Sequence, residues 1–568
     1  MEIKTRIILI LGLLAAIGST ILWQAFRLQV LNQTKKGEVL KFSLPPKRGI
    51  IYDRNGEVLA ITLNAPSVYA CPCQIEDPYK TAIFLSKALH LKSKILLKRL
   101  KSGKNFVWIK RWVSDRELKR IRELKGIGIQ RENRRYYPNG PLAGQVLGFV
   151  GFDGYGLEGV ERQFDNYLRG KSGYYYGIKD ARGKIIISPK FPFRPAEDGY
   201  NLFLTLDHRI QYAVEEALAR VIKKWHAKAG YAVIIEPHTG EVLALANYPR
   251  FNPNNFRRAR AKDYRNHVIT DTFEPGSTFK PILAAAALDR GVLKPYDIIY
   301  AENGRYRIDD AIIHDVKPFK WLSAQQVIVH SSNIGAVKIG EILGKKAFYE
   351  YIKRFGFGQK TGIDLGGESK GLLRPVTTWK RVDAATICFG QGISVTALQL
   401  ATAYAAIANG GKLIRPFVVK RIVDNKGKIV KVFKPKIRNR VISERTAKRL
   451  REILREVVLE GTGKMAEIDG YEIAGKTGTA QKPKNGYYQR NKAIASFVGF
   501  FPASDPKVVI AIIIDEPRPI RYGGIVAAPA FREVALDIIW KWHLSPCISP
   551  IEMTRILQSK QVAKKNET

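Results

Sequence analysis

The sequence predicts an α+β protein in which one antiparallel sheet is flanked by helices. Strand patterns occur at both ends of residues 200–545, and the chain between them is mainly helical in pattern. An apolar run at residues 7–27 predicts one transmembrane helix, and residues 28–199 predict a mixed α+β pedestal domain. A short cytoplasmic segment, 1–6, is expected before the run. A basic tail, 546–568, is expected after the large domain.

The apolar run at residues 7–27 is long enough to cross a membrane, because a helix rises ~1.5 Å per residue and the hydrocarbon layer is ~30 Å thick. It is longer than the apolar core of a cleaved signal peptide and continues through Trp23 and Phe26, which favours an uncleaved anchor. More Lys and Arg residues follow the run than precede it. That count alone would keep the bulk of the chain inside, but long translocated domains largely escape this rule.

Residues 28–199 contain a hairpin pattern and a strongly basic stretch. Apolar residues flank Asn55-Gly56, a pair typical of a β-hairpin turn. Between Lys92 and Arg135, sixteen Lys and Arg residues stand against four Asp and Glu, and leucines recur at helical spacing. We expect this stretch to form solvated faces of small helices, with contact to an anionic polymer or lipid as the alternative.

The pattern in residues 200–545 predicts the main sheet. Residues 201–206 alternate as a strand, and Asp207 is expected to cap a helix. Two strands joined at residues 237–240 are expected to form a second hairpin. Three more strands are expected at 472–480, 493–501 and 508–515. Strands at both ends with helices between them predict a single sheet in this α+β domain.

The chain carries 94 Lys and Arg residues against 51 Asp and Glu, a formal charge of +43 over 568 residues. Polyanion binding is the first interpretation of such a charge. However, outside residues 92–135 the excess is spread along the chain, and no helix-turn-helix, zinc-finger or RNA-binding signature occurs. Nucleic acid is therefore not an expected partner. Four cysteines, two of them separated by one proline, predict neither a disulfide framework nor a zinc site.

One serine and one lysine form the centre of the predicted active site. Ser277 stands at the expected start of a helix, and Lys280 follows one turn later on the same face. A serine nucleophile needs a base, and burial lowers the pKa of a lysine enough for that task. The same spacing recurs at Ser504 and Lys507, but a proline and flanking strands exclude a shared helical face there.

Two further motifs make this pattern specific. Ser331-Ser332-Asn333 is the only Ser-x-Asn sequence in the chain. Lys-Ser/Thr-Gly occurs four times, and only Lys476-Thr477-Gly478, followed by Thr479, opens onto a predicted strand pair. The edge of such a strand can pair with an extended peptide, so this copy is the candidate for substrate binding.

Ser-x-x-Lys, Ser-Asp-Asn and Lys-Thr-Gly are the signature of penicillin-binding proteins and class A β-lactamases, and this chain matches it with Ser332 in the middle of the second motif. The chain resembles a class B penicillin-binding protein, a peptidoglycan D,D-transpeptidase, from the anchor to about Trp542. The resemblance also includes Arg48-Gly49, Asp53-Arg54-Asn55-Gly56, Gly156-Leu157-Glu158-Gly159-Val160-Glu161 and Phe273-Glu274-Pro275-Gly276. It implies a penicillin-binding, serine β-lactamase-like transpeptidase domain that needs no metal and no organic cofactor.

The resemblance implies a catalytic role for five residues. Ser277 would attack the penultimate D-alanine carbonyl of a stem peptide, with Lys280 as the general base. Ser331 would relay the proton to the leaving group. Asn333 would hold the lysine and the substrate amide. Lys476 would tune Ser331.

Substrate contacts and cell location follow from the same resemblance. Backbone N–H groups of Ser277 and Thr479 would form the oxyanion hole, with Gly478 allowing close approach. Thr477 and Thr479 would grip the terminal carboxylate. Three residues would line the cleft: Gly390, Gln391 and Gly392. Because this chemistry lies outside the cytoplasm, we expect a single-pass inner-membrane protein with its N-terminus inside and its catalytic domain on the outer, periplasmic face.

Class B enzymes include division and elongation types. The length of the chain, and its ending soon after Tyr522-Gly523-Gly524, are more similar to the division-specific FtsI type than to the elongation type. The implied partners are peptidoglycan stem peptides, lipid-linked glycan strands, a polytopic FtsW-type glycosyltransferase, other divisome membrane proteins, and β-lactam antibiotics as inhibitors. An elongation-type transpeptidase, a D,D-carboxypeptidase or β-lactamase, and a β-lactam sensor are the alternatives. The chain has no Glu-x-x-Leu-Asn segment of the kind that class A β-lactamases use, and its single apolar span argues against a sensor.

Overall fold

A computed structural model describes residues 2–27, 39–121, 124–179, 185–187, 191–484 and 487–547. The chain divides into two compact units: residues 1–47 with 169–199, and residues 48–168 with 200–568. The domain boundaries expected at residues 27, 199 and 545 stay predictions. In the expected tail, the amide of Cys547 donates to the carbonyl of Gly470 at 2.8 Å. Residues 548–568 lie outside the described part.

The first unit begins with helix α1 (Glu2–Phe26), whose large apolar side chains are exposed. Among the helices of the described residues, α1 is the one that is long and apolar enough to cross a membrane, as expected for residues 7–27. The other described residues of this unit include a small antiparallel sheet around one strand. Strand β6 (Gly173–Lys179) pairs with β1 (Val39–Leu44), β7 (Ile185–Ile187) and β8 (Phe193–Arg194).

The second unit begins with a hairpin of β2 (Ile51–Tyr52) and β3 (Val58–Ala70), which confirms the turn predicted at Asn55-Gly56. Its basic stretch forms helices only in part. Helix α3 (Ser93–Leu100) buries Leu96 and Leu100 against α2 (Pro78–Leu89), as the leucine spacing predicts. The rest of the stretch contains the short helix α4 (Asp115–Lys119) and two strands that pair with β3, namely β4 (Val107–Lys110) and β5 (Ile127–Tyr136).

A buried ion network joins segments that are far apart in the sequence. Glu161, in helix α6 (Gly159–Gln163), is fully buried and accepts from Arg48 Nε and Arg135 Nε, both at 2.6 Å. Burial opposes ionisation of Glu161, but the charges of the two arginines outweigh it and lower the pKa of its carboxyl. The network therefore holds the chain before β2 against β5 and α6.

The main sheet has the strand order β11-β10-β22-β21-β20, and all of its neighbouring strands are antiparallel. This confirms the second hairpin and the three strands that the sequence predicts near residue 500. The strands are β10 (Ala229–Ile235), β11 (Val242–Tyr248), β20 (Ala474–Lys484), β21 (Tyr487–Phe501) and β22 (Val508–Asp515).

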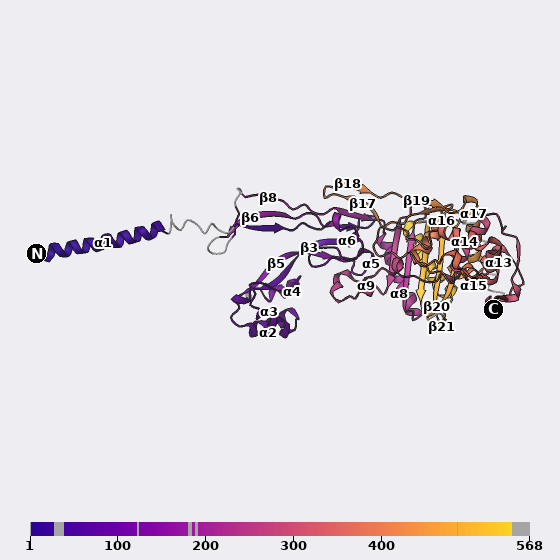
Figure 1. Cartoon of the computed structure of the whole chain (residues 1–568), viewed down its shortest axis with the longest axis horizontal. Helices are drawn as coiled ribbons and strands as arrows, with labels where there is room; N and C mark the ends of the chain where they lie inside the picture. The colour runs from indigo at the N-terminus through magenta and orange to yellow at the C-terminus, as the bar shows by residue number, and fades with distance from the viewer. Residues whose placement is uncertain are drawn as a thin grey trace. The chain divides into compact units, whose positions relative to one another are not determined.

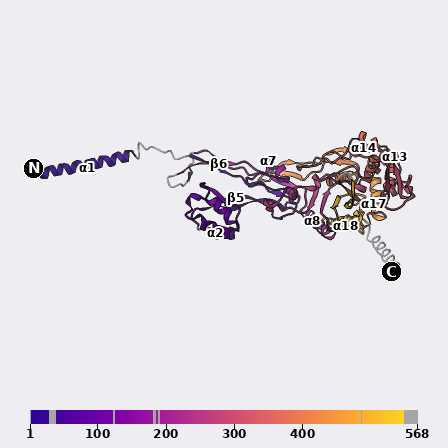
Figure 2. The same cartoon turned by 60° about the horizontal axis from the view of Figure 1, so that its bottom comes forward.

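Helices cover both faces of this sheet. The side chains of β22 alternate between the two faces, and every residue of the strand is buried, so neither face is open to solvent there. Ile510, Ile512 and Ile514 pack in one hydrophobic cluster with helices α8 (His208–Lys224) and α18 (Gly523–Trp542). Figure 2 shows these two helices side by side. The intervening residues of β22 pack in the other cluster, with helices α11 (Lys280–Asp289) and α16 (Ala397–Ala408). Figure 1 shows the yellow-orange strands with α8 and α16 around them.

The strand predicted at residues 201–206 forms, but the prediction that it belongs to the main sheet is wrong. Strand β9 (Asn201–Leu204) does form, and Asp207 caps α8 by accepting from the backbone N–H of Arg209, as expected. However, β9 does not join the main sheet. It lies in a second, mixed sheet, antiparallel to β17 (Val419–Val423) and parallel to β2. Alternation predicts a strand but not its partner, and both partners here are distant in sequence.

Candidate active site

Ser277 lies in a 3-10 turn, Gly276–Phe279, that leads directly into helix α11. Residues three apart are eclipsed in a 3-10 turn, so Ser277 and Lys280 share a face, as their spacing predicts. Gly276 has φ +56°, a left-handed conformation that favours glycine. Its amide donates to the carbonyl of Gly390 at 3.0 Å. The Gly390-Gln391-Gly392 segment thus holds the backbone of Gly276, next to the candidate nucleophile Ser277.

Lys280 is completely buried, and its amine is directed at the Ser-x-Asn motif. Its Nζ donates to the Ser331 carbonyl at 2.6 Å, to Asn333 Oδ1 at 2.8 Å and to Ser331 Oγ at 3.2 Å. Burial and the nearby charge of Lys476 lower the pKa of Lys280 well below its ordinary value, although Asp315 opposes this. A lower pKa makes more of the amine neutral at a given pH, and only the neutral amine is able to accept a proton.

The Ser-x-Asn motif is the connection between helices α12 (Ala324–Val329) and α13 (Asn333–Leu343). Ser331 has φ +61°, which is uncommon for a residue other than glycine and is often found at functional sites. This conformation directs both its carbonyl and its hydroxyl to Lys280. Ser332 is the N-cap of α13 and accepts from the amide of Gly335 at 2.8 Å.

Asp315, which the sequence analysis did not single out, fixes the motif from the loop after strand β14 (Ala311–His314). Its carboxylate accepts from the Ser332 hydroxyl at 2.6 Å, from the amide of Ile334 at 3.1 Å and from the amide of Asn333. A negative charge is favourable at the N-terminus of α13. No sequence pattern predicts this contact, because Asp315 belongs to no motif.

Lys476 is also completely buried, and burial lowers its pKa to about 7. Its amine contacts Thr462 Oγ1 at 3.4 Å and the carbonyl and hydroxyl of Thr477 at 3.3 and 3.4 Å. Thr462, a second residue that the sequence analysis missed, hydrogen-bonds Thr477 through the two hydroxyls at 2.7 Å. Among the described residues, the hydrogen-bond partners of the Lys476 amine are Thr462 and Thr477, so the expected tuning of Ser331 stays a prediction.

The Lys476-Thr477-Gly478-Thr479 segment lies on β20 and packs against the turn that carries Ser277. A methyl group on Gly478 would come 2.4 Å from Ser496 Oγ and 2.9 Å from Thr278 Cγ2, so only glycine fits there. Thr479 accepts from the amide of Gly523, the first residue of α18, at 3.0 Å. Gly392 donates its amide to Glu274 at 2.9 Å.

These segments border one cleft of about 840 Å³. The predicted site residues in its wall are Ser277, Ser331, Asn333, Gln391, Thr477 and Thr479. The others support this wall from behind or beside it: Lys280, Lys476, Gly478, Gly390 and Gly392. The cleft wall also includes Tyr522, Gly523 and Gly524, for which the sequence predicts no role in the site. The tertiary structure therefore brings the predicted motifs together around one space.

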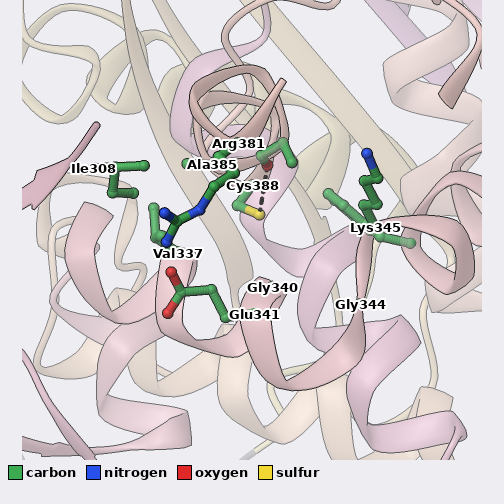
Figure 3. A pocket seen from close by; sticks show the side chains of 11 residues that line it. Ile308, Val337, Gly340, Glu341, Gly344, Lys345, Arg381, Ala385 and Cys388 are labelled. Atoms are coloured by element: carbon green, nitrogen blue, oxygen red, sulfur yellow. Dashed lines mark hydrogen bonds between the residues drawn. The ribbon is translucent and has the colours of Figure 1, made fainter. Parts of the chain in front are cut away.

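A smaller cavity of about 190 Å³ lies between α13 and helix α15 (Arg381–Cys388), beside Val337 and Cys388 (Figure 3). Glu341 and Arg381 point toward one another at its edge. The thiol of Cys388 donates to the Ala384 carbonyl at 3.1 Å, and burial raises its pKa to about 12. This thiol is therefore unreactive at neutral pH.

Two of the motif copies that the sequence does not favour lie in other surroundings. Ser504 and Lys507 are in the connection between β21 and β22, where Lys507 pairs with Asp505. Thr361, of the Lys360-Thr361-Gly362 copy, is buried and donates to Glu368. Neither copy contributes to the cleft.

One acidic group, Asp53, Asp207 and His208, has its possible metal-binding atoms within 4.8 Å of one another. These atoms already have protein partners. His208 Nδ1 contacts Asp53 Oδ2 at 2.7 Å, and Asn55 Nδ2 donates to both carboxylates. Arg209 also donates to Asp207. The group is therefore explained as the polar contact between the β2–β3 turn and the start of α8.

We predict that Asp315→Asn lowers the second-order rate of acylation by a β-lactam roughly tenfold, because it loosens the Ser-x-Asn motif. Loss of the Asp315 charge also removes an effect that raises the pKa of Lys280. The lower limb of the pH–rate profile should therefore move to lower pH. Stopped-flow acylation across pH measures both effects.

The matched control is Asp77→Asn, which alters the N-cap of α2 without touching the cleft. It should leave the rate and the profile unchanged. A pH profile of Asp315→Asn that coincides with that of the unmodified protein would show that Asp315 is structural only.

Comparison with known proteins agrees with this geometry. Residues 230–536 match the penicillin-binding protein transpeptidase domain, and residues 43–204 match the penicillin-binding protein dimerisation domain. Stage V sporulation protein D of Bacillus subtilis is 38% identical over 522 residues, covering 89% of this chain and 80% of that protein. Peptidoglycan D,D-transpeptidase FtsI of Escherichia coli K12 is 33% identical over 563 residues, covering 96% and 93%.

Solved structures show the same similarity. Penicillin-binding protein 3 of Mycobacterium tuberculosis, in complex with aztreonam, superposes with a TM-score of 0.71 at 29% identity, covering 89% of this chain and 98% of that one. Penicillin-binding protein 2X of Streptococcus thermophilus superposes with a TM-score of 0.71 at 26% identity, covering 89% and 81%. The matched family domains, these relatives and the three motifs around one cleft lead to the same conclusion. The chain belongs to the penicillin-binding protein transpeptidases, in the class B type that carries a dimerisation domain.

Proposed function

We propose that this protein is a peptidoglycan D,D-transpeptidase that cross-links stem peptides through an acyl-enzyme on Ser277. The observation that carries the proposal is the cleft itself. Ser277, Ser331 and Thr479 come from different elements and line one space, and the buried amine of Lys280 donates to Ser331 and Asn333. Relatives named as peptidoglycan D,D-transpeptidases support it.

In the acylation step, Lys280 accepts the proton of the Ser277 hydroxyl as the oxygen attacks the penultimate D-alanine carbonyl. Backbone N–H groups of Ser277 and Thr479 stabilise the oxyanion of the tetrahedral intermediate. Ser331 passes the proton to the departing nitrogen. The peptide bond breaks, D-alanine leaves, and an ester joins the stem peptide to Ser277.

In the second step, the amine of a neighbouring stem peptide attacks this ester. The amine loses a proton through the same relay, Ser277 regains its hydrogen, and a new peptide bond links the two strands. Thr477, Thr479 and Gln391 are placed in the cleft wall, where they are able to bind the donor peptide, and Asn333 holds Lys280 in position. The amine of Lys476 contacts the hydroxyl of Thr477 on the side away from the cleft.

A membrane location with the N-terminus inside and the catalytic domain outside fits this substrate, because α1 is an apolar helix of spanning length. A septal role, with an FtsW-type glycosyltransferase and other divisome proteins as partners, is supported by the similarity to FtsI. β-Lactams are the expected covalent inhibitors, since the related penicillin-binding protein 3 was solved with aztreonam.

The test supplies the full-length protein in membranes with lipid-linked disaccharide pentapeptide and a glycan polymerase, and separates the digested products by chromatography and mass spectrometry. We expect cross-linked dimers that require the protein. Shortened, uncross-linked peptides in their place would assign the chain to the D,D-carboxypeptidases and overturn the proposal.

A further inference from the structure

Three arginine side chains gather around one tryptophan in the second unit, and none of them lines the active-site cleft. Arg111 follows β4, Arg134 lies in β5, and Arg257 lies in the last turn of the 3-10 helix Pro253–Arg258. Their guanidinium carbons lie 5.8, 5.8 and 5.2 Å from the centre of the Trp112 ring. Guanidinium groups stack favourably on such rings.

A second ring extends this aromatic surface. Phe152, between helices α5 (Gly144–Leu147) and α6, lies 5.0 Å from Trp112 between ring centres. Arg111 and Arg257 lie over Phe152 as well, at 4.8 and 4.3 Å. Two of the three guanidinium groups therefore share the same two rings, which places like charges close together.

The charges of this arginine cluster are not balanced. Glu132 binds Arg111 at both Nε and Nη2, at 2.9 and 2.6 Å. Within the described part of the chain, neither Arg134 nor Arg257 forms an ion pair. Burial and repulsion from Arg111 and Arg134 lower the pKa of Arg257, an uncommon direction for an arginine. Three cations and one carboxylate leave an excess of two positive charges.

Trp112, around which the three arginines gather, has an unfavourable backbone conformation. Its φ is +58°, a left-handed value that bulky residues rarely adopt. The amide of Trp112 donates to Ser67 Oγ at 3.0 Å, and the next amide donates to the Pro66 carbonyl at 2.8 Å. The indole Nε1 is buried and has no hydrogen-bond partner among the described residues. Strain and an unpaired donor at one residue are typical of a functional site rather than of a stabilising contact.

We propose that Arg111, Arg134 and Arg257 form a binding site for a phosphate group, supplied either by a phospholipid headgroup or by a soluble pyrophosphate compound. Planar guanidinium groups bind phosphate oxygens in pairs, and a phosphate has enough oxygens to be shared by several arginines. The two excess positive charges attract an anionic phosphate group. Arg257 is exposed and Arg134 is half-buried, so the ligand has access from solvent. The site is independent of the acylation chemistry.

The chain offers a matched control in Arg421. Its guanidinium carbon lies 4.1 Å from the ring centre of Phe203, so it is also a stacked arginine. Unlike the cluster, it stacks on a ring over which no second cation is found among the described residues. If added phosphate protected Arg421 as strongly as the cluster, the protection would be general to stacked arginines.

The test measures modification of each arginine by p-hydroxyphenylglyoxal with mass spectrometry on the full-length protein. The baseline is the protein in maltoside micelles, which contain no phosphate. One arm adds pyrophosphate to the micelles at constant ionic strength. The other places the protein in phosphatidylglycerol nanodiscs without pyrophosphate. We expect modification of Arg134 and Arg257 to slow about tenfold in at least one arm, with Arg421 unchanged.

The two arms separate the sources of the phosphate. Protection by pyrophosphate assigns a soluble phosphate compound, and protection in nanodiscs assigns a lipid headgroup. Protection in neither arm, or equal protection of Arg421, overturns the proposal.

Single substitutions give a second measurement. In micelles, Arg257→Gln should weaken pyrophosphate binding about tenfold by calorimetry if the soluble source holds, and Arg421→Gln should not change it. If the lipid source holds, Arg257→Gln should instead remove the protection of Arg134 in nanodiscs. Unchanged behaviour of Arg257→Gln in both measurements contradicts the site. Both variants should retain labelling of Ser277 by penicillin, so failure here is distinct from failure of the proposed function.

Discussion

Replacing Ser277 with alanine should abolish covalent labelling by a fluorescent penicillin and all cross-linking of stem peptides. The physical reason is that the variant has no oxygen to form the acyl-enzyme, and removal of a nucleophile from a catalytic set lowers the rate by up to about 10⁶-fold. Ser277 lies in the wall of the cleft. Fluorescence of the protein band after denaturing electrophoresis measures the adduct, and peptide mass spectrometry locates it.

The control for this substitution is Ser504→Ala, because Ser504 belongs to the other Ser-x-x-Lys copy and lies outside the cleft. It should label at the full rate. The fold of Ser277→Ala should be intact, since a hydroxyl is removed without leaving a large cavity, and circular dichroism would show this. A labelled band that persists in Ser277→Ala would assign the nucleophile to another residue.

Replacing Lys280 with methionine should slow acylation by roughly 10²–10⁴-fold, the usual contribution of a general base. Methionine keeps most of the side-chain volume at this completely buried position. Acylation by the unmodified protein should accelerate as pH rises, because the neutral amine is the active form. The lowered pKa of Lys280 places this rise below the ordinary range of lysine. Lys280→Met should lose that limb of the profile.

Lys507→Met, in the second copy of the spacing, is the matched control and should change neither the rate nor its pH dependence. An unchanged pH profile in Lys280→Met would remove Lys280 as the base.

The pH dependence of stability gives an independent check of the lowered lysine pKa values. Lys280 and Lys476 have lower pKa values in the folded chain than in the unfolded chain, so the unfolded chain binds more protons. The contribution of Lys476 to stability therefore rises with pH from about 7, its folded value, toward the ordinary lysine value, and that of Lys280 changes in the same direction.

The sequence by itself determined the local elements and the chemical groups. The Ser277–Lys280 spacing, the Asn55-Gly56 turn, the Asp207 cap and the strand 508–515 are all patterns that a few neighbouring residues specify. Such features depend on side-chain period, turn conformation and capping, which act over short distances along the chain. For the same reason the order of the three motifs could indicate the family before their geometry was known.

The tertiary structure decided which distant groups meet. Asp315 reaches the Ser-x-Asn motif, Thr462 reaches Thr477, and β9 joins β2 and β17 instead of the main sheet. The arginine cluster likewise combines β4, β5 and a turn near residue 257. None of these contacts leaves a periodic trace in the sequence, because each depends on long-range packing and on charges that come together only in the folded chain. The left-handed conformations of Ser331 and Trp112 have the same origin, since surrounding contacts hold what local preference disfavours.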